Sequence, residues 1–257
     1  MKHTPLKHLD CIWCDNRRKS TFFMNDQNKA IIHGVPGETA RARGVMRAIW
    51  PLLATLFACG IFCGAVMPRI SLGLAGAGFV LAAAFLVWAV RDGMQGIDAF
   101  FKGARGEEAV AALLAELPGG YHVFHDFDCA GRGIDHVVVG DNGVFVIETK
   151  CWAGRVELKD GGVLVDRKRP DRSPLSQVRA AALSLGAFLT DRMGDATLGL
   201  LPVVCFASDT FVPGLSKQTD TVVCNASRLR SVIMEHAGHL APEGKERVVL
   251  VMEHKDL

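Results

Sequence analysis

Three ionisable residues lie close together in a stretch that otherwise predicts two buried strands. Asp135 stands in a run of β-branched residues, and Glu148 and Lys150 close a second such run. Between the runs, residues 140–143 read Gly-Asp-Asn-Gly, which is a strong short-range signal for a β-hairpin. The sequence therefore predicts an antiparallel hairpin with two carboxylates and one ammonium group at one end.

The register of this hairpin decides whether the three side chains meet. A two-residue loop at 141–142 places Asp135 opposite Glu148. A loop at 142–143 instead places Asp135 opposite Lys150. Side chains alternate faces along a strand with period two, so both registers bring all three groups to one face. A three-residue loop would move Asp135 to the other face.

Apart from these groups, the predicted hairpin is apolar on both faces. The face with the charged groups otherwise carries valines, and the opposite face carries Ile134, Val138, Phe145 and Ile147. Strands of this kind are central and covered on both sides. His136 is expected to point to that opposite face and to be structural. Two carboxylates in such surroundings must be neutralised by protons, a partner or a metal ion.

Asp135 and Glu148 supply the oxygen ligands that a hard divalent cation such as Mg²⁺ (or Mn²⁺) prefers. A lysine two residues beyond the glutamate can orient a water or stabilise charge on a phosphate. The alternative interpretation is a buried ion pair of Lys150 with either acid. The residue types alone leave both interpretations open.

Five short motifs accompany the three residues. They are Gly-Ala-Arg-Gly-Glu at 103–107, Gly-Ile-Asp-His-Val-Val-Val at 133–139, Gly-Val-Phe-Val-Ile-Glu-Thr-Lys at 143–150, Gly154, and Pro-Leu-Ser-Gln-Val at 174–178. Together they resemble the nuclease-related domain (NERD) family, which is similar to restriction-endonuclease-like enzymes of the PD-(D/E)xK type. The resemblance covers roughly residues 103–224. It implies an α/β fold with a mixed central sheet flanked by helices, and a metal-dependent phosphodiesterase activity.

The resemblance also implies a role for each matching residue. Asp135 and Glu148 would hold the metal, and Lys150 would be the catalytic lysine. Glu107 and Gln177 match further polar positions of the family. The implied cofactor is Mg²⁺ (or Mn²⁺), and the implied partner is nucleic acid, with DNA favoured over RNA.

The positions of Glu107 and Gln177 can also be judged from helical spacing. Glu107 shares the inward face of a helix predicted over 105–117, whereas Glu108 falls on its alanine-rich side. Glu107 could reach the metal as a third ligand, or it could be an acid that stabilises the helix N-terminus. Gln177 stands in the first turn of a helix predicted over 174–191. There it could position a water or a phosphate oxygen, or be an ordinary polar residue.

Two apolar runs precede the predicted domain. Residues 49–67 and 70–90 contain no charged residue. At a rise of ~1.5 Å per residue, each run is close to the ~30 Å thickness of a bilayer's hydrocarbon core. The sequence therefore predicts a two-helix transmembrane hairpin over 49–90 that contacts the lipid bilayer. A buried pair of helices in a globular domain is the alternative. With no charge inside either run, a transport or proton-relay role has no residue to carry it.

Basic residues flank the predicted hairpin on its outer sides. Arg41, Arg43 and Arg47 precede the first run, and Arg91 follows the second, while the connecting loop holds Arg69. By the positive-inside rule, both termini are expected in the cytoplasm of an integral membrane protein, with the bacterial inner membrane as the expected location. Small residues such as those at 60 and 64 let helices approach closely. They would support either the hairpin itself or a homodimer.

The segments before and after the predicted transmembrane hairpin complete the expected organisation. Residues 1–48 predict a basic cytoplasmic tail that is flexible or partly ordered. Cys11 and Cys14 in it could bind zinc with nearby histidines, although a single Cys-x-x-Cys is more often an incidental thiol pair. Residues 91–102 are expected to connect the membrane hairpin to a nuclease-like domain over 103–257.

Charge is distributed unevenly along the chain and limits the expected function. Residues 1–48 hold nine Lys and Arg against four Asp and Glu, whereas residues 91–257 hold nineteen against twenty-three. The mildly acidic domain lacks the broad basic surface of a tight duplex binder, and Arg167-Lys168-Arg169 with Arg172 form its one local basic patch. Three functions remain. The first is a membrane-anchored, metal-dependent nuclease, and the second is a non-catalytic binding or scaffold module with a nuclease fold, tethered to the membrane. The third is a zinc-binding membrane adaptor, in which the tail and the two apolar runs are the functional part.

Overall fold

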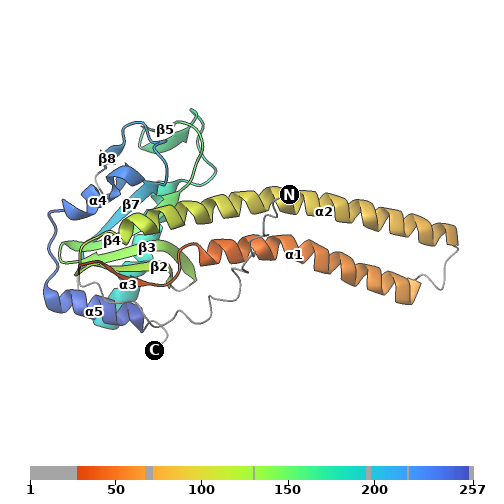
Figure 1. Ribbon diagram of the computed structural model, residues 1–257, viewed down its shortest axis with the longest axis horizontal. Helices are drawn as coiled ribbons and strands as arrows, with labels where there is room; N and C mark the ends of the chain where they lie inside the picture. Colours follow the sequence, from red (N-terminus) through yellow and green to blue (C-terminus); the bar gives the residue numbers. More distant parts are fainter. Residues whose placement is uncertain (1–27, 67–71, 130, 195–197, 219, 255–257) are drawn as a thin grey trace, which may run out of the picture.

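The computed structural model describes residues 28–66, 72–129, 131–194, 198–218 and 220–254. It consists of an α/β domain from which two long antiparallel helices project (Figure 1). Cys11 and Cys14, the thiol pair that could bind zinc, lie outside the described residues.

The domain is built on a mixed sheet of seven strands in the order β1-β2-β3-β4-β7-β9-β8. The strands are β1 (Ile31–His33), β2 (His122–Cys129), β3 (Arg132–Gly140), β4 (Gly143–Lys150), β7 (Leu200–Phe206), β8 (Leu215–Lys217) and β9 (Val222–Asn225). The pairs β1–β2, β4–β7 and β7–β9 are parallel, and the other neighbours are antiparallel. Strands β5 (Val156–Lys159) and β6 (Gly162–Val165) form a separate small hairpin.

Helices cover both faces of the sheet. Helices α3 (Pro174–Met193) and α5 (Pro242–Glu253) pack on the face that carries Val137 and Val146. The end of α2 (Leu72–Leu114) and α4 (Ala226–Met234) pack on the face that carries Val138 and Phe145. All four of these strand residues are fully buried. The prediction of a mixed central sheet flanked by helices is therefore confirmed.

The central hairpin adopts the first of the two expected registers. Gly140 pairs with Gly143 around a two-residue turn, and the paired ladder runs as far as His136 and Ile147. Asp135 and Glu148 are the next residue on each strand beyond that last pair. Gly143 has a φ of 136°, a conformation that side-chain-bearing residues rarely adopt. The Asn142 side chain donates a hydrogen bond of 2.6 Å to the carbonyl of Ile233 in α4, which fixes the turn against the domain.

The ladder between β2 and β3 is interrupted at one position. Asp126 and Asp135 lie level with each other but do not pair, whereas the residues on both sides of them do. Asp126 has a left-handed backbone, with a φ of 50°. Beyond this interruption Ile134 packs in the same cluster as Val137, so the prediction that Ile134 shares a face with Val138 is wrong.

The projecting helices form a continuous extension of the domain. We refer to residues 38–66 and 72–100 as the stem. It comprises α1 (Glu38–Ile61), a short π-helix (Phe62–Val66) and most of α2. The predicted connector at 91–102 is helical, and the helix expected to begin at Arg105 is the last part of the 43-residue helix α2. Residues 91–102 contain no proline that would break this helix.

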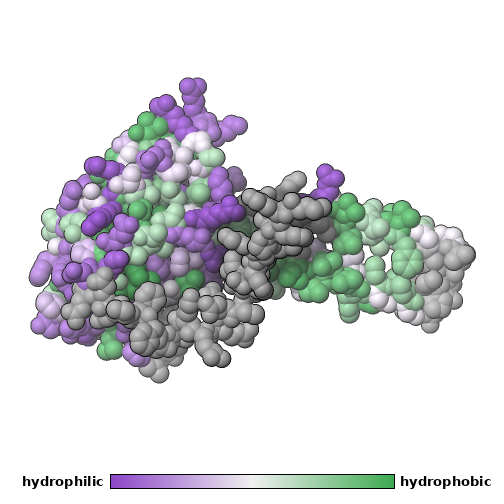
Figure 2. All heavy atoms as spheres, in the orientation of Figure 1, coloured by the Kyte–Doolittle hydropathy of each residue, from purple (hydrophilic) through white to green (hydrophobic). Residues whose placement is uncertain are grey.

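Apolar side chains of the stem point outward rather than into a core. Trp50, Phe57 and Leu81 are 67%, 73% and 72% exposed, and hydrophobic residues dominate this part of the surface in Figure 2. Among the described residues, one helical stretch, Glu38–Gly64, is long and apolar enough to cross a membrane, and Gly76–Trp88 is a shorter apolar helix.

The small residues of the stem are not all at the contact between its two helices. A Cβ added at Gly78 would lie 2.6 Å from Phe62, so this glycine allows α2 to approach the opposite arm closely. A Cβ added at Gly60 or Gly64 would meet no atom within 4 Å. Of the two predicted uses of Gly60 and Gly64, helix packing within the hairpin is therefore not observed.

Part of the segment expected to be a flexible or partly ordered tail is built into the fold. Strand β1 pairs in parallel with β2 at the sheet edge, and α1 begins at Glu38. The Thr39 amide in the first turn of α1 donates a hydrogen bond of 2.5 Å to the carboxylate of Asp126 in β2. Residues 28–37 and the first turn of α1 thus attach the stem to the domain.

Candidate active site

The five residues singled out by sequence all line one cleft of about 980 Å³. They come from four elements: Glu107 from α2, Asp135 from β3, Glu148 and Lys150 from β4, and Gln177 from α3. We refer to this cleft as the acidic cleft. It lies where the open end of the β3–β4 hairpin meets the helices from both faces of the sheet.

Asp135 is held deep in this cleft by the backbone of the neighbouring strand. Its Oδ2 accepts a hydrogen bond of 2.7 Å from the Thr149 amide. Burial, together with the nearby carboxylates of Glu148 and Glu107, raises the pKa of Asp135 well above its usual value. The Thr149 hydrogen bond and Lys150 act in the opposite direction. The neutral, protonated form of Asp135 is therefore favoured more than it is for an exposed aspartate.

Glu148 and Lys150 form an ion pair at the same end of the sheet. The distance from Lys150 Nζ to Glu148 Oε1 is 2.5 Å, and the side chains are 18% and 14% exposed. This is the ion pair expected as the alternative to a metal site. The two interpretations are compatible, because one lysine offsets one of three converging carboxylates.

Glu107 reaches the cleft because α2 passes very close to the end of β4. A Cβ added at Gly106 would lie 2.7 Å from Cβ of Cys151, so only glycine permits this approach. Burial and then the carboxylates of Asp126 and Glu148 raise the pKa of Glu107 to about 7. The adjacent Glu108 instead pairs with Arg41 away from the cleft. The expected difference in placement between the two glutamates is confirmed.

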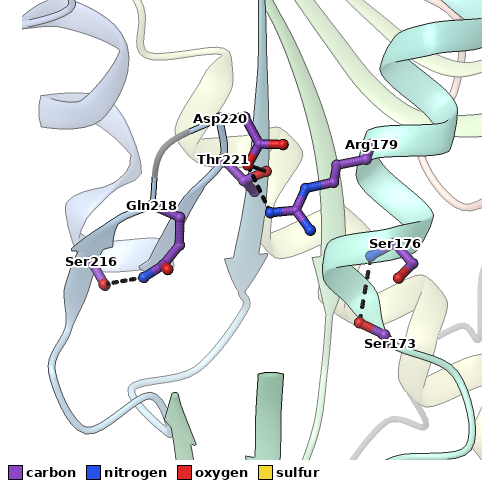
Figure 3. Close-up of polar contacts among 7 residues, drawn as sticks. All are labelled: Ser173, Ser176, Arg179, Ser216, Gln218, Asp220 and Thr221. Carbon is purple, nitrogen blue, oxygen red and sulfur yellow. Dashed lines mark hydrogen bonds and ion pairs between the residues drawn. The ribbon is translucent and has the colours of Figure 1, made fainter. Parts of the chain in front are cut away.

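Gln177 enters the cleft from the first turn of α3. Ser173 caps this helix by accepting a 3.4 Å hydrogen bond from the Ser176 amide, and Arg179 binds Asp220 at 2.7 Å, as Figure 3 shows. These contacts fix the orientation of the helix start. Gln177 Oε1 is buried and has no hydrogen-bond partner among the described residues. A buried amide oxygen of this kind needs a water, an ion or a ligand group.

The donor set of the acidic cleft fits a hard divalent cation. The carboxylates of Asp135, Glu148 and Glu107 line the same cleft as Gln177, whose Oε1 has no hydrogen-bond partner among the described residues. In the part of the chain that the structure describes, these groups do not bring three ligand atoms within 4.8 Å of one another. Mg²⁺ does not require this, since it is usually held by one or two carboxylates and retains several waters.

Positively charged side chains surround the acidic groups. Those lining the cleft are Arg43, Lys102, Arg132, Arg169 and Arg172. Arg169 and Arg172 belong to the basic patch predicted from sequence. Arg167 of the same patch lies instead at a separate, smaller pocket.

Arg43 and Asp126 are among the cleft residues that sequence reasoning did not find. Arg43 was assigned to the tail, and only the attachment of α1 to the domain brings it to the cleft. Asp126 lies in a strand whose alternation gives no sign of its kink, and it faces the cleft beside Glu107. No local pattern could have identified either residue.

His136 has the structural position expected for it. It is fully buried, and its Nδ1 lies 2.8 Å from Nδ1 of His125. Burial lowers the pKa of both imidazoles, which are therefore neutral at neutral pH.

Comparisons with known proteins give one family match and two partial similarities. Residues 102–207 match the family model of the nuclease-related domain (NERD), and this segment contains all five predicted site residues. An uncharacterized protein of Bacillus anthracis is 38% identical over 60 residues, which is 21% of this chain and 28% of that protein. The chain therefore matches little more than a quarter of that relative's length.

One solved structure shows a distant similarity. It is the small subunit of the heterodimeric restriction endonuclease R.BspD6I, at 14% identity and a TM-score of 0.23. The overlay covers 63% of this chain and 82% of that subunit.

Proposed function

We propose that this protein is a membrane-anchored nuclease that hydrolyses phosphodiester bonds of nucleic acid, with DNA as the expected substrate, on the cytoplasmic face of the membrane. The observation that carries the proposal is the convergence of Asp135, Glu148, Lys150, Glu107 and Gln177 in one cleft. The match of residues 102–207 to the nuclease-related domain supports it.

Asp135 and Glu148 would hold Mg²⁺ or Mn²⁺, and Glu107 would be a third carboxylate at the same ion. Such an ion, when bound, neutralises phosphate charge and lowers the pKa of a coordinated water. The raised pKa of Asp135 and of Glu107 supports this assignment, because both groups gain most from a nearby cation. The Thr149 amide keeps Asp135 pointed into the cleft.

Lys150 would orient the attacking water and stabilise the charge that develops on the phosphate. Its ammonium group is held at the cleft by Glu148, which sets its position before substrate arrives. Gln177 would use its unpartnered Oε1 to accept a hydrogen bond from that water.

The basic residues at the cleft would bind the nucleic-acid backbone. Arg132 comes from the start of β3, and Arg169 and Arg172 come from the loop before α3, so they could contact phosphates on two sides of the acidic groups. Because the domain as a whole is mildly acidic, we expect modest affinity that falls steeply with salt.

The stem would anchor the enzyme in the bilayer through residues 49–90. Large parts of its apolar side chains, such as those of Trp50, Phe57 and Leu81, are exposed, and a hydrocarbon environment would cover them. Arg43 and Lys102, at the base of the stem, also line the cleft. Substrate would therefore bind close to the membrane surface, and the flanking arginines would keep both termini cytoplasmic.

The test uses the full chain in detergent micelles with plasmid and single-stranded DNA. Cleavage is expected with Mg²⁺ or Mn²⁺ and not with EDTA. Lys150→Ala is expected to abolish it without loss of the folded state, as judged by circular dichroism. Lys159→Ala, which changes an exposed lysine at the end of β5, is the matched control and should cleave normally. Equal activity of Lys150→Ala and the wild type would remove the proposed mechanism.

A non-catalytic scaffold module is the second candidate function. The ion pair between Glu148 and Lys150 favours it, because that pair can satisfy both groups without a metal. Isothermal titration calorimetry distinguishes the two candidates. Absence of Mg²⁺ and Mn²⁺ binding, together with absence of cleavage, would favour the scaffold.

A further inference from the structure

A second group of metal-ligand side chains lies where β1, β2 and the end of α5 meet. His33 Nε2 lies 3.2 Å from His122 Nδ1, and His33 Nδ1 lies 3.6 Å from Glu253 Oε1. One ligand atom from each residue lies within 4.8 Å of the other two. In the described residues, this is the one place where three His, Cys, Asp or Glu side chains meet that condition. We refer to these three residues as the histidine cluster.

The strand register holds the two imidazoles in place. His33 is level with Phe124 across the parallel β1–β2 pair, and His122 lies two residues before Phe124 on the same face of β2. The His33 ring stacks on Phe124 at a centroid distance of 4.2 Å and an interplanar angle of 9°. Glu253 reaches them from the last turn of α5. Three elements far apart in sequence thus present their donors to one point.

The protonation states suit metal binding. Burial lowers the pKa of His33 and of His122, and although Glu253 opposes this effect, the net change is downward for both. Both imidazoles are therefore neutral at neutral pH and keep nitrogen lone pairs available. Two neutral imidazoles and one carboxylate give the cluster a net negative charge that a divalent cation would offset.

The donor types select a different metal from that of the acidic cleft. Imidazole nitrogens suit Zn²⁺ and its neighbours in the first transition row, whereas the all-oxygen set of the cleft suits Mg²⁺ or Mn²⁺. Two histidines and one glutamate also leave a further coordination position for a water or ligand. A pocket of about 430 Å³, lined in part by His33, Glu253 and Glu38, adjoins the cluster.

We propose that His33, His122 and Glu253 bind a zinc-type transition-metal ion that fastens the base of the stem to the domain. Strand β1 has three residues and one neighbouring strand, and α1 begins five residues after His33. A metal ion across β1, β2 and α5 would secure this short strand. It would also fix the orientation of α1 relative to the C-terminal helix α5. Because Arg43 of α1 lines the acidic cleft, its position there would depend on the same metal ion.

Metal content of the full chain in detergent tests this proposal. Cys11→Ser/Cys14→Ser serves as the background, because these thiols could bind zinc independently. After loading with Zn²⁺ and exhaustive dialysis, elemental analysis should find one zinc per chain. His33→Ala and His122→Ala should lose it, whereas His254→Ala, which changes the exposed histidine next to Glu253, should retain it.

Two further measurements keep the proposal open to contradiction if an alanine variant fails to fold. Glu253→Gln preserves shape, and it should weaken zinc binding by more than the ~10–100-fold typical of changes outside the ligand shell. Co²⁺ substituted in the same background should show visible d–d bands of nitrogen and oxygen ligation without a thiolate charge-transfer band. Zinc retained in both histidine variants, or no zinc in the background protein, would overturn the proposal.

The outcome is independent of the proposed nuclease activity. His33→Ala should keep Mg²⁺-dependent cleavage, since His33 does not line the acidic cleft. Inactivity of the wild type with one zinc bound would contradict the nuclease alone. Cleavage by a protein that binds no zinc would contradict the histidine cluster alone.

Discussion

The β3–β4 hairpin and the stem are equally apolar in sequence but have opposite surroundings. Phe145 in the hairpin is fully buried between two layers of helices, whereas Phe57 in the stem is 73% exposed. The hairpin carries its charges at the end where it forms the acidic cleft, and the stem carries none between Arg47 and Arg69. Hydrophobicity alone therefore does not distinguish a buried core from an apolar surface that the protein leaves exposed. The distinction comes from whether the rest of the chain covers the side chains.

The largest effect is expected from changing the hairpin's chemistry while leaving its packing intact. Asp135→Asn should lower Mg²⁺-dependent cleavage by more than ~100-fold, because a proposed metal ligand is lost. Thermal stability without metal should stay equal or rise, since the variant removes a carboxylate that is costly to ionise. Asp128→Asn, at an exposed position of β2, should behave as the wild type in both measurements. A large loss of stability in Asp135→Asn would show that this aspartate is structural.

Two matched substitutions of phenylalanine by alanine test the difference in burial directly. Phe145→Ala should lower the free energy of unfolding by about 3–5 kcal/mol, because it leaves a cavity in a packed core. Phe57→Ala should change it by about 0.5 kcal/mol or less, because Phe57 contacts little protein. Urea titration of the full chain in detergent provides both values. Equal losses would mean that the stem is part of the domain core.

The acidic cleft should give the domain an unusual pH dependence. The pKa of Glu107 is raised from 4.5 to about 7, so the folded state binds a proton that the unfolded state has released. Without metal, stability should fall by about 1–3 kcal/mol as pH rises from about 4.5 through about 7. Glu107→Gln should flatten this decline, and Mg²⁺ should reduce it in the wild type. Thermal unfolding across that pH range measures the effect, and an unchanged decline in Glu107→Gln would contradict it.

The smallest effect concerns the hydrogen bond between Thr39 at the start of the stem and Asp126 in β2 of the domain. Asp126→Asn weakens the carboxylate acceptor for the Thr39 amide and should cost about 1 kcal/mol or less. It also removes one of the charges that raise the pKa of Glu107, so the pH midpoint of the metal-free decline should move down. An unchanged midpoint would show that the base of the stem does not influence the site.

The parts of the structure that sequence predicted are those determined by local spacing. The turn at 140–143 limited the hairpin to two registers, one of which is observed, and helical spacing separated Glu107 from Glu108. The helix over 174–191 was found because its apolar residues repeat over five turns. These features depend on residues within about twenty positions of one another.

The missed features depend on contacts between distant segments. Strand β1 is too short to show a period, and His33 meets His122 across 89 positions of sequence. Asp126 reaches Thr39 across 87 positions, and its backbone kink leaves no trace in the alternation of β2. Arg43 belongs to the cleft only because β1 and Asp126 hold the start of α1 against the domain.

The most direct test of the central claim is anomalous diffraction from crystals of the full chain soaked in Mn²⁺. The claim predicts an anomalous peak between the carboxylates of Asp135 and Glu148, with Lys150 turned toward the space where a phosphate would bind. Absence of manganese there, with Lys150 still paired to Glu148 and the metal found elsewhere or not at all, would contradict it.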